Sequence, residues 1–233
     1  MKFAATLLSA AFLAQSASAH YIWTTLIAGS TTSSAAVRQP QTNSPVEDVT
    51  SNNIRCNVSP GAASETVSVA AGATIGFKLD NTLYHQGPAA IYLGKAPSTA
   101  ASWDGSGANW FKASPILLNL IDTWLTPSPD RSPNGEQLST LSNSLTSTPL
   151  NSPPPSPQLS RRENIEQIGL HVAGAPQWYI SCAQIKITGG GSANPAKVSI
   201  PGYVSPSDPG LTVNIYYPEP TSYTVPGPRP FRG

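Results

Sequence analysis

Alternating polar and apolar residues mark several short segments of the chain. The pattern runs through residues 65–70 and 73–79, and it is clearest over residues 179–188. Successive side chains of a strand point to opposite faces, so a period of two predicts β-strands. Shorter segments of the same character follow at residues 198–200 and 212–216. Gly and Pro clusters separate these segments, and short strands spaced in this way predict an antiparallel β-sandwich.

Composition supports an all-β fold. Only 11% of the 233 residues are charged, and 24 are proline. Surface helices usually carry many Lys, Glu and Arg residues and exclude proline, so a helical bundle is disfavoured. The length suits one sandwich or barrel domain. A formal net charge of +1 argues against a nucleic-acid partner, which requires a basic face.

One long segment breaks the alternation. Residues 113–164 are rich in Ser, Thr, Leu and Pro, and they include Pro153-Pro154-Pro155. This composition predicts a long loop without paired strands over most of the segment. We expect Trp110, Phe111 and Trp124 to pack on the sandwich nevertheless.

The first 19 residues have the pattern of a secretory signal peptide. Lys2 precedes an apolar stretch from Ala4 to Ala14, and Ala17-Ser18-Ala19 forms a small-x-small cleavage site. No other stretch suggests a membrane span, so we expect a secreted, extracellular protein. Its catalytic domain would cover residues 20–233.

Cleavage after Ala19 would make His20 the first residue of the mature chain. A terminal histidine offers its α-amine and its imidazole Nδ1 to one metal ion, and the amine titrates near neutrality. The alternative is that cleavage leaves a histidine there with no chemical role.

The other candidate groups lie far along the chain. The three histidines are His20, His85 and His171. His85 precedes Gln86-Gly87-Pro88, a loop suited to holding a side chain rigidly, and His171 is expected at a strand. Gln177 and Tyr179 are two residues apart on an extended segment, so they share a face. A set of nitrogen donors without thiolate favours Cu(II).

Two cysteines, Cys56 and Cys182, are present. In a secreted protein the default prediction is a single disulfide between them. A catalytic thiol is the less favoured alternative in an oxidising compartment.

Several stretches together resemble the fungal lytic polysaccharide monooxygenases of auxiliary activity family nine, once classed as glycoside hydrolases. They cover most of residues 20–112 and 165–228. The stretches are HYIWTTLIAG from His20, RQPQTNSPVEDVTSNNIRCN from Arg38, LYHQGPAAIYLGKAP from Leu83, WDGSGANWFK from Trp103, IEQIGLHVAGAPQWYISCAQIKI from Ile165, and the tail SIPGY…DPG…YTVPGP.

The resemblance implies an immunoglobulin-like or fibronectin-III-like sandwich with one copper ion. Carried over by motif, His20 would bind copper through its amine and imidazole, and His85 would supply the third nitrogen. Tyr179 would lie near the axial position, while His171 and Gln177 would act beside the metal in catalysis. Tyr223 resembles an aromatic residue that stacks on sugar rings.

The implied reaction is oxidative cleavage of cellulose or a related β-1,4-glucan at C1 or C4. It uses O2 or hydrogen peroxide as co-substrate and a small-molecule reductant or redox protein as electron donor. We expect a monomer without nucleic-acid or membrane partners.

Three alternatives remain at this stage. A hydrolase would need two suitably spaced carboxylates, and a non-catalytic cellulose-binding protein would need no histidines. A member inactivated by residues 113–164 is the third. In that segment Asn164 stands where the family has arginine, although Glu166 matches its acid, and the sheet would lack a strand.

Overall fold

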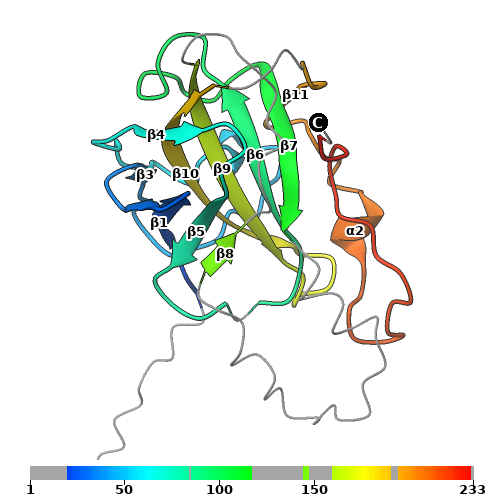
Figure 1. Cartoon of the computed structure of the whole chain (residues 1–233). Coiled ribbons are helices and arrows are strands. Elements are labelled where there is room, and N and C mark those ends of the chain that lie inside the picture. The colour runs from blue at the N-terminus through cyan, green and yellow to red at the C-terminus, as the bar shows by residue number, and fades with distance from the viewer. Residues whose placement is uncertain (1–19, 84, 117–143, 147–158, 190–193, 232–233) are drawn as a thin grey trace, which may run out of the picture.

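The computed structural model describes residues 20–83, 85–116, 144–146, 159–189 and 194–231 (Figure 1). The expected signal peptide, residues 1–19, and Trp124 lie outside the described residues. Within the described ranges, no helix has the length and apolar character needed to cross a membrane.

Two β-sheets form a sandwich (Figure 1). The smaller sheet has four strands in the order β2 (Thr31–Ser33), β1 (Trp23–Ala28), β5 (Ile75–Leu79) and β8 (Ser144–Thr146). The larger has seven: β11 (Val198–Ser199), β7 (Ala108–Ile116), β6 (Ala89–Lys95), β9 (Leu159–Gly169), β10 (Gln177–Thr188) and β3 (Val37–Arg38) in order, with β4 (Val67–Ala70) also on β10.

Antiparallel pairing dominates both sheets. The pairing of β4 with β10 is parallel, and the other recorded strand pairs are antiparallel. The helical elements among the residues that the structure describes are two short turns, η1 (Asn52–Ile54) and α2 (Pro209–Thr212). The predicted all-β antiparallel sandwich is therefore confirmed.

Both faces of the larger sheet are buried. Ile91 and Ile165 belong to the core between the sheets, whereas Tyr92 and Ile168 belong to a second core on the opposite face. Ile54 of η1, Leu211 of α2 and the loop residue Tyr203 help to complete this outer core. Burial on two faces explains why the central strands lack a simple polar–apolar alternation.

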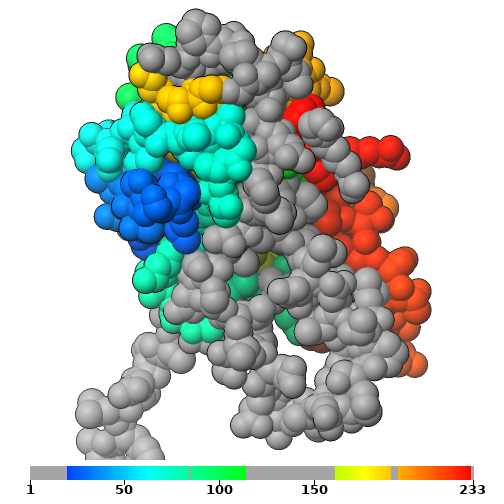
Figure 2. Space-filling model, in the orientation of Figure 1, coloured from blue at the N-terminus to red at the C-terminus, as the bar shows by residue number. Residues whose placement is uncertain are grey.

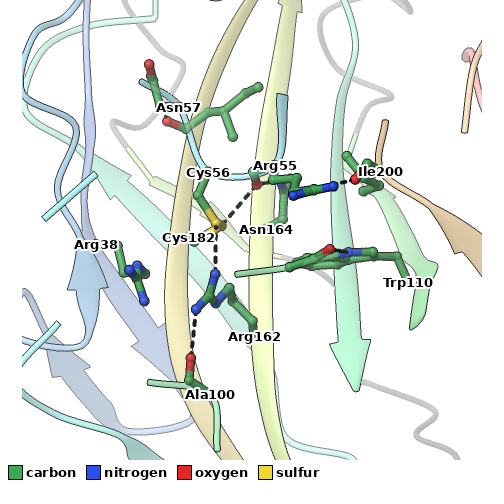
Figure 3. The surroundings of a disulfide bond; sticks show 12 residues. Arg38, Arg55, Cys56, Asn57, Ala100, Trp110, Arg162, Asn164, Cys182 and Ile200 are labelled. Carbon is green, nitrogen blue, oxygen red and sulfur yellow. Dashed lines mark hydrogen bonds between the residues drawn. A yellow bond between two sulfur atoms is a disulfide. The ribbon is translucent and has the colours of Figure 1, made fainter. Parts of the chain in front are cut away.

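A disulfide joins Cys56 to Cys182 across a sequence separation of 126 residues, as predicted (Figure 3). It ties the loop after η1 to β10, and closing so long a loop restricts the unfolded chain by about 4–5 kcal/mol in the entropic model. Figure 3 shows Arg162 of β9 beside it, where the guanidinium donates to the Ala100 carbonyl at 2.8 Å.

The predicted strand at residues 212–216 is wrong. The Asp208 side chain instead caps α2 by accepting from the Gly210 amide at 2.8 Å, with Pro209 in the first turn. Asn214 Oδ1 then accepts from the Tyr216 amide at 2.9 Å and bends the chain. Local side-chain hydrogen bonds override the apolar pattern here.

The described parts of residues 113–164 form paired strands, so the expectation that the sheet would lack a strand is wrong. β7 extends to Ile116, residues 144–146 form β8, and residues 159–164 form the first half of β9. β9 pairs with β6 on one side and β10 on the other, so the sheet is continuous. Residues 117–143 and 147–158 lie outside the described residues.

The first half of β9 buries an unusual set of polar side chains. Arg161, Arg162, Glu163 and Asn164 are all buried, and Glu163 is 0% exposed. Glu163 shares its strand face with Ile165, so its carboxylate points into the core between the sheets. Neither carboxylate oxygen has a hydrogen-bond partner among the described residues. Burial accordingly raises the pKa of Glu163 well above its ordinary value.

Because Glu163 is buried without a partner among the described residues, we predict that it destabilises the fold more as the pH rises. Its pKa is higher in the folded than in the unfolded protein, so stability falls from the unfolded pKa of about 4.3 upward. We expect Glu163→Leu to raise the free energy of unfolding at pH 7 by about 1–4 kcal/mol, with a smaller gain at pH 4. Thermal and denaturant unfolding of the metal-free protein between pH 4 and 8 measures this. Parallel pH profiles for wild type and Glu163→Leu would contradict it.

Candidate metal centre

Four aromatic side chains from distant segments gather at one end of the sandwich. The ring centres of His20 and His85 lie 5.8 Å apart, and Tyr179 lies 5.8 Å from His20 and 5.0 Å from His85. His171 stacks on His85 at 4.0 Å with an interplanar angle of 15°. The residues expected as metal ligands are thus neighbours, with His171 beside them.

Hydrogen bonds to the end of β9 hold the loop that carries His85. Gln86 O accepts from the Leu170 amide at 2.7 Å, and Gln167 Nε2 donates to His85 O at 3.1 Å. Gly87 has a φ of +144°, and a Cβ there would lie 1.8 Å from Ile168 O. Glycine is therefore required for this close approach of two backbones.

Gly169, the last residue of β9, makes room for two imidazoles. A Cβ at this position would lie 3.1 Å from His171 Nδ1 and 3.2 Å from His85 Cβ. His171 itself comes two residues after the strand ends, so the expectation that it lies at a strand is corrected. Its position past the strand end lets its ring turn back onto His85.

The segment that begins at His20 is anchored just before β1. Tyr21 is 2% exposed, and its hydroxyl donates to Gln167 Oε1 at 2.5 Å. The Ile22 amide donates to Asp80 Oδ1 at 2.8 Å, and the Asp80 amide donates to Ile22 O at 3.0 Å. Tyr21 and Gln167 were not among the predicted site residues, because nothing in the sequence reveals a contact across 146 positions.

Tyr179 and Gln177 both lie on β10, and the Tyr179 hydroxyl donates to Gln177 Oε1 at 3.0 Å. Burial, followed by the charge of Glu47, raises the pKa of the Tyr179 phenol above its ordinary value. Burial, followed by the charge of His20, lowers the pKa of His171. The phenol is therefore protonated and the imidazole of His171 is neutral near pH 7.

The contacts of Tyr223 are with other residues than these rings. Its hydroxyl donates to Gly210 O at 2.9 Å, and its ring packs against the outer core. Tyr216 and Tyr217 are 59% and 83% exposed, and the Tyr216 hydroxyl donates to His171 O at 3.0 Å. These exposed tyrosines beside the site were not predicted, although the pair Tyr216-Tyr217 before a proline was visible in the sequence.

The spacing of the two imidazoles fits a single ion between them. A metal–imidazole bond is about 2 Å long, so rings on opposite sides of one ion have centres roughly 6 Å apart. The 5.8 Å between His20 and His85 matches this value. In the part of the chain that the structure describes, His, Cys, Asp and Glu side chains form no group of three around a metal. The third donor expected from the sequence, the amine of His20, is a main-chain group.

A family model, Auxiliary Activity family 9 (formerly GH61), matches residues 20–223. The chain belongs to this family. The match begins at His20, the residue expected to follow the signal peptide.

Named relatives are similar over nearly the whole chain. An AA9 family lytic polysaccharide monooxygenase H from Malbranchea cinnamomea is 43% identical, over 95% of this chain and 96% of that protein. An AA9 family lytic polysaccharide monooxygenase C from Emericella nidulans is 40% identical, over 97% and 98%. The crystal structure of a cellulose-active polysaccharide monooxygenase from M. thermophila matches with a TM-score of 0.71 and 30% identity, over 91% of this chain and 99% of that one.

The expected family and enzyme class are confirmed, and this AA9 chain is a lytic polysaccharide monooxygenase by family. The alternatives of a hydrolase and of a non-catalytic binding protein are not favoured. The assignment of individual ligands and catalytic groups stays a prediction.

Gly169 provides a direct test of the site's packing. We expect Gly169→Ala to push His85 and His171 apart while costing about 1–3 kcal/mol of stability, as overpacking does. The imidazole NMR signals of these two histidines in the metal-free protein should both shift. Gly61→Ala is the matched control, because a Cβ there would meet Gln39 O at an ordinary 3.6 Å. Unshifted imidazole signals in Gly169→Ala would contradict the packing.

Proposed function

We propose that the mature protein is a secreted, monomeric, copper-dependent monooxygenase that cleaves cellulose or a related β-1,4-glucan. The observation that carries the proposal is the 5.8 Å spacing of the His20 and His85 rings, with Tyr179 beside both, in an AA9 chain. Oxidation would occur at C1 or C4 of a glucose unit.

Three nitrogens would hold the copper ion: the amine and imidazole of His20 and the imidazole of His85. Tyr179 would lie beside the ion, with its ring 5.8 Å from that of His20 and 5.0 Å from that of His85. When bound, copper would accept one electron from an external small-molecule or protein donor and would activate O2 or hydrogen peroxide. Nitrogen ligands without thiolate suit Cu(II).

His171 and Gln177 would manage protons and hydrogen bonds beside the ion. His171 is neutral, and its buried Nδ1 has no hydrogen-bond partner among the described residues. A neutral imidazole can accept or donate a proton close to the reacting oxygen. The Gln177 amide holds the Tyr179 hydroxyl at 3.0 Å and thus orients the phenol.

Exposed aromatic rings beside the site would bind the polysaccharide. Tyr217 is 83% exposed, and the Tyr216 hydroxyl donates a hydrogen bond to His171 O. Aromatic faces pack on the apolar faces of sugar rings. Tyr223, the aromatic expected from the sequence, is partly buried and would contribute the edge of this surface.

The state of the N-terminus tests the copper site. One extra residue before His20 converts its amine to an amide, which is a poor donor, while the core is untouched. We expect this variant to unfold like the mature protein in chelator but to lose copper-induced stabilisation. For the mature form, that stabilisation is about 2.7 kcal/mol when the free copper concentration is roughly 100 times the Kd for copper.

Product release gives the second readout of this experiment. The mature protein should release oxidised oligosaccharides from cellulose with ascorbate, whereas the extended form should release none. Equal oxidised products from both forms would overturn the proposed site, and a pure binding protein would release none from either.

Substitutions at His85 and Tyr179 should differ in severity. His85→Ala removes a nitrogen ligand and should lower copper affinity at least about 100-fold, whereas Tyr179→Phe removes only a long-range contact and should retain copper with an altered visible spectrum. Calorimetric titration of both variants measures this. Wild-type copper affinity in His85→Ala would contradict the assignment of the third nitrogen.

A further inference from the structure

A backbone bridge places Glu47 opposite Gln177. The Val46 amide donates to Trp178 O at 2.9 Å, and the Trp178 amide donates to Val46 O at 2.8 Å. The bridge is antiparallel, so the residue after Val46 faces the residue before Trp178. Val46 and Trp178 are both buried, so the position of Glu47 is set by the core.

The side chains of this pair are in contact. Gln177 Nε2 donates to Glu47 Oε1 at 3.4 Å, while Gln177 Oε1 accepts from the Tyr179 hydroxyl at 3.0 Å. One amide thus connects a carboxylate on the loop with the phenol of the candidate site.

The chemistry of the three groups gives this connection a direction. A carboxylate accepts hydrogen bonds only, whereas a primary amide has an accepting end and a donating end. With Glu47 on one side, the NH2 end of Gln177 must face the loop. Its carbonyl end then faces Tyr179, and the phenol has to act as the donor.

We propose that Glu47 is a positioning residue that fixes the orientation of the Gln177 amide. The proposal rests on the proposed function, because it concerns the same site. In the observed orientation the phenol oxygen of Tyr179 receives no bond from Gln177, so its lone pairs are left for the ion expected between the imidazoles. In the reversed orientation an N–H of Gln177 would occupy one of these lone pairs.

Glu47 lies at the protein surface. It lines a cavity of about 370 Å³ together with Asp48, Val49, Trp178 and the loop Gly174–Pro176. Its side chain is exposed, so replacing it removes no core contact. Asp48 lines the same cavity, but its Oδ1 accepts from the Thr50 amide at 2.8 Å and from Thr50 Oγ1 at 2.6 Å. Asp48 is therefore a matched control.

Glu47→Lys tests the proposal most sharply, because a lysine can only donate. We expect it to turn the Gln177 amide around, so that Oε1 faces the lysine and Nε2 faces Tyr179. Asp48→Lys makes the same charge change on the next residue and should leave the amide as it is. The readout in the metal-free protein is the pair of Gln177 side-chain amide NMR signals, assigned through their loss in Gln177→Glu.

In the copper-loaded protein, Glu47→Lys should release oxidised oligosaccharides roughly 10-fold more slowly, as loss of a supporting group near a metal does. Retention on cellulose should be unchanged. Glu47→Gln, which can still accept through its Oε1, should recover most of the rate.

Two results would overturn the proposal: Gln177 amide signals that move no more in Glu47→Lys than in Asp48→Lys, or, where wild type releases oxidised product, equal release rates for Glu47→Lys and wild type. The amide signals are independent of the reaction. If they move while wild type releases no oxidised product, the proposed function fails and the positioning by Glu47 stands.

Discussion

The pairing of β9 with both neighbours is the interaction on which the rest of the site depends. Its hydrogen bonds to β6 and β10 fix where the end of this interior strand lies in the larger sheet. There Gln167 contacts both the His85 loop and Tyr21, and Gly169 leaves space for two rings. Tyr179 lies directly across the register from Gln167. One strand end therefore contacts the His85 loop, Tyr21 next to His20, and the strand that carries Tyr179.

The same strand carries the least favourable part of the fold. Its second half supplies Ile165 and Ile168 to the two cores, whereas its first half buries Arg161, Arg162 and Glu163. Burial lowers the pKa of Arg162 to about 10, with the charge of Arg38 contributing in the same direction. Backbone pairing holds these side chains inside despite the cost of desolvating them. The end of β9 that forms the site is thus continuous with a first half whose buried side chains are polar or charged.

Sequence reasoning was successful where a signal is local. Alternation located β4, β5 and β10, and motif resemblance indicated His20, His85, His171, Gln177 and Tyr179, whose rings and amide the structure brings together. It failed for β9, because a strand buried on both faces need not alternate, and its charged residues and neighbouring prolines resemble a loop. Contacts such as Tyr21 with Gln167, or Glu47 with Gln177, depend on the register of strand pairing, which cannot be predicted from a single sequence.

The bond from Tyr21 to Gln167 spans 146 positions, and this separation sets an order of events during biosynthesis. Tyr21 emerges early from the ribosome, yet its anchor Gln167 is made late in the chain. Contacts between residues so far apart in sequence form late, because closing the long intervening loop costs conformational entropy before the contact can stabilise the chain. Tyr21 and the adjacent His20 consequently lack this anchor for most of synthesis and acquire it only once Gln167 has been made. The copper site proposed above would therefore be complete only after β9 has paired.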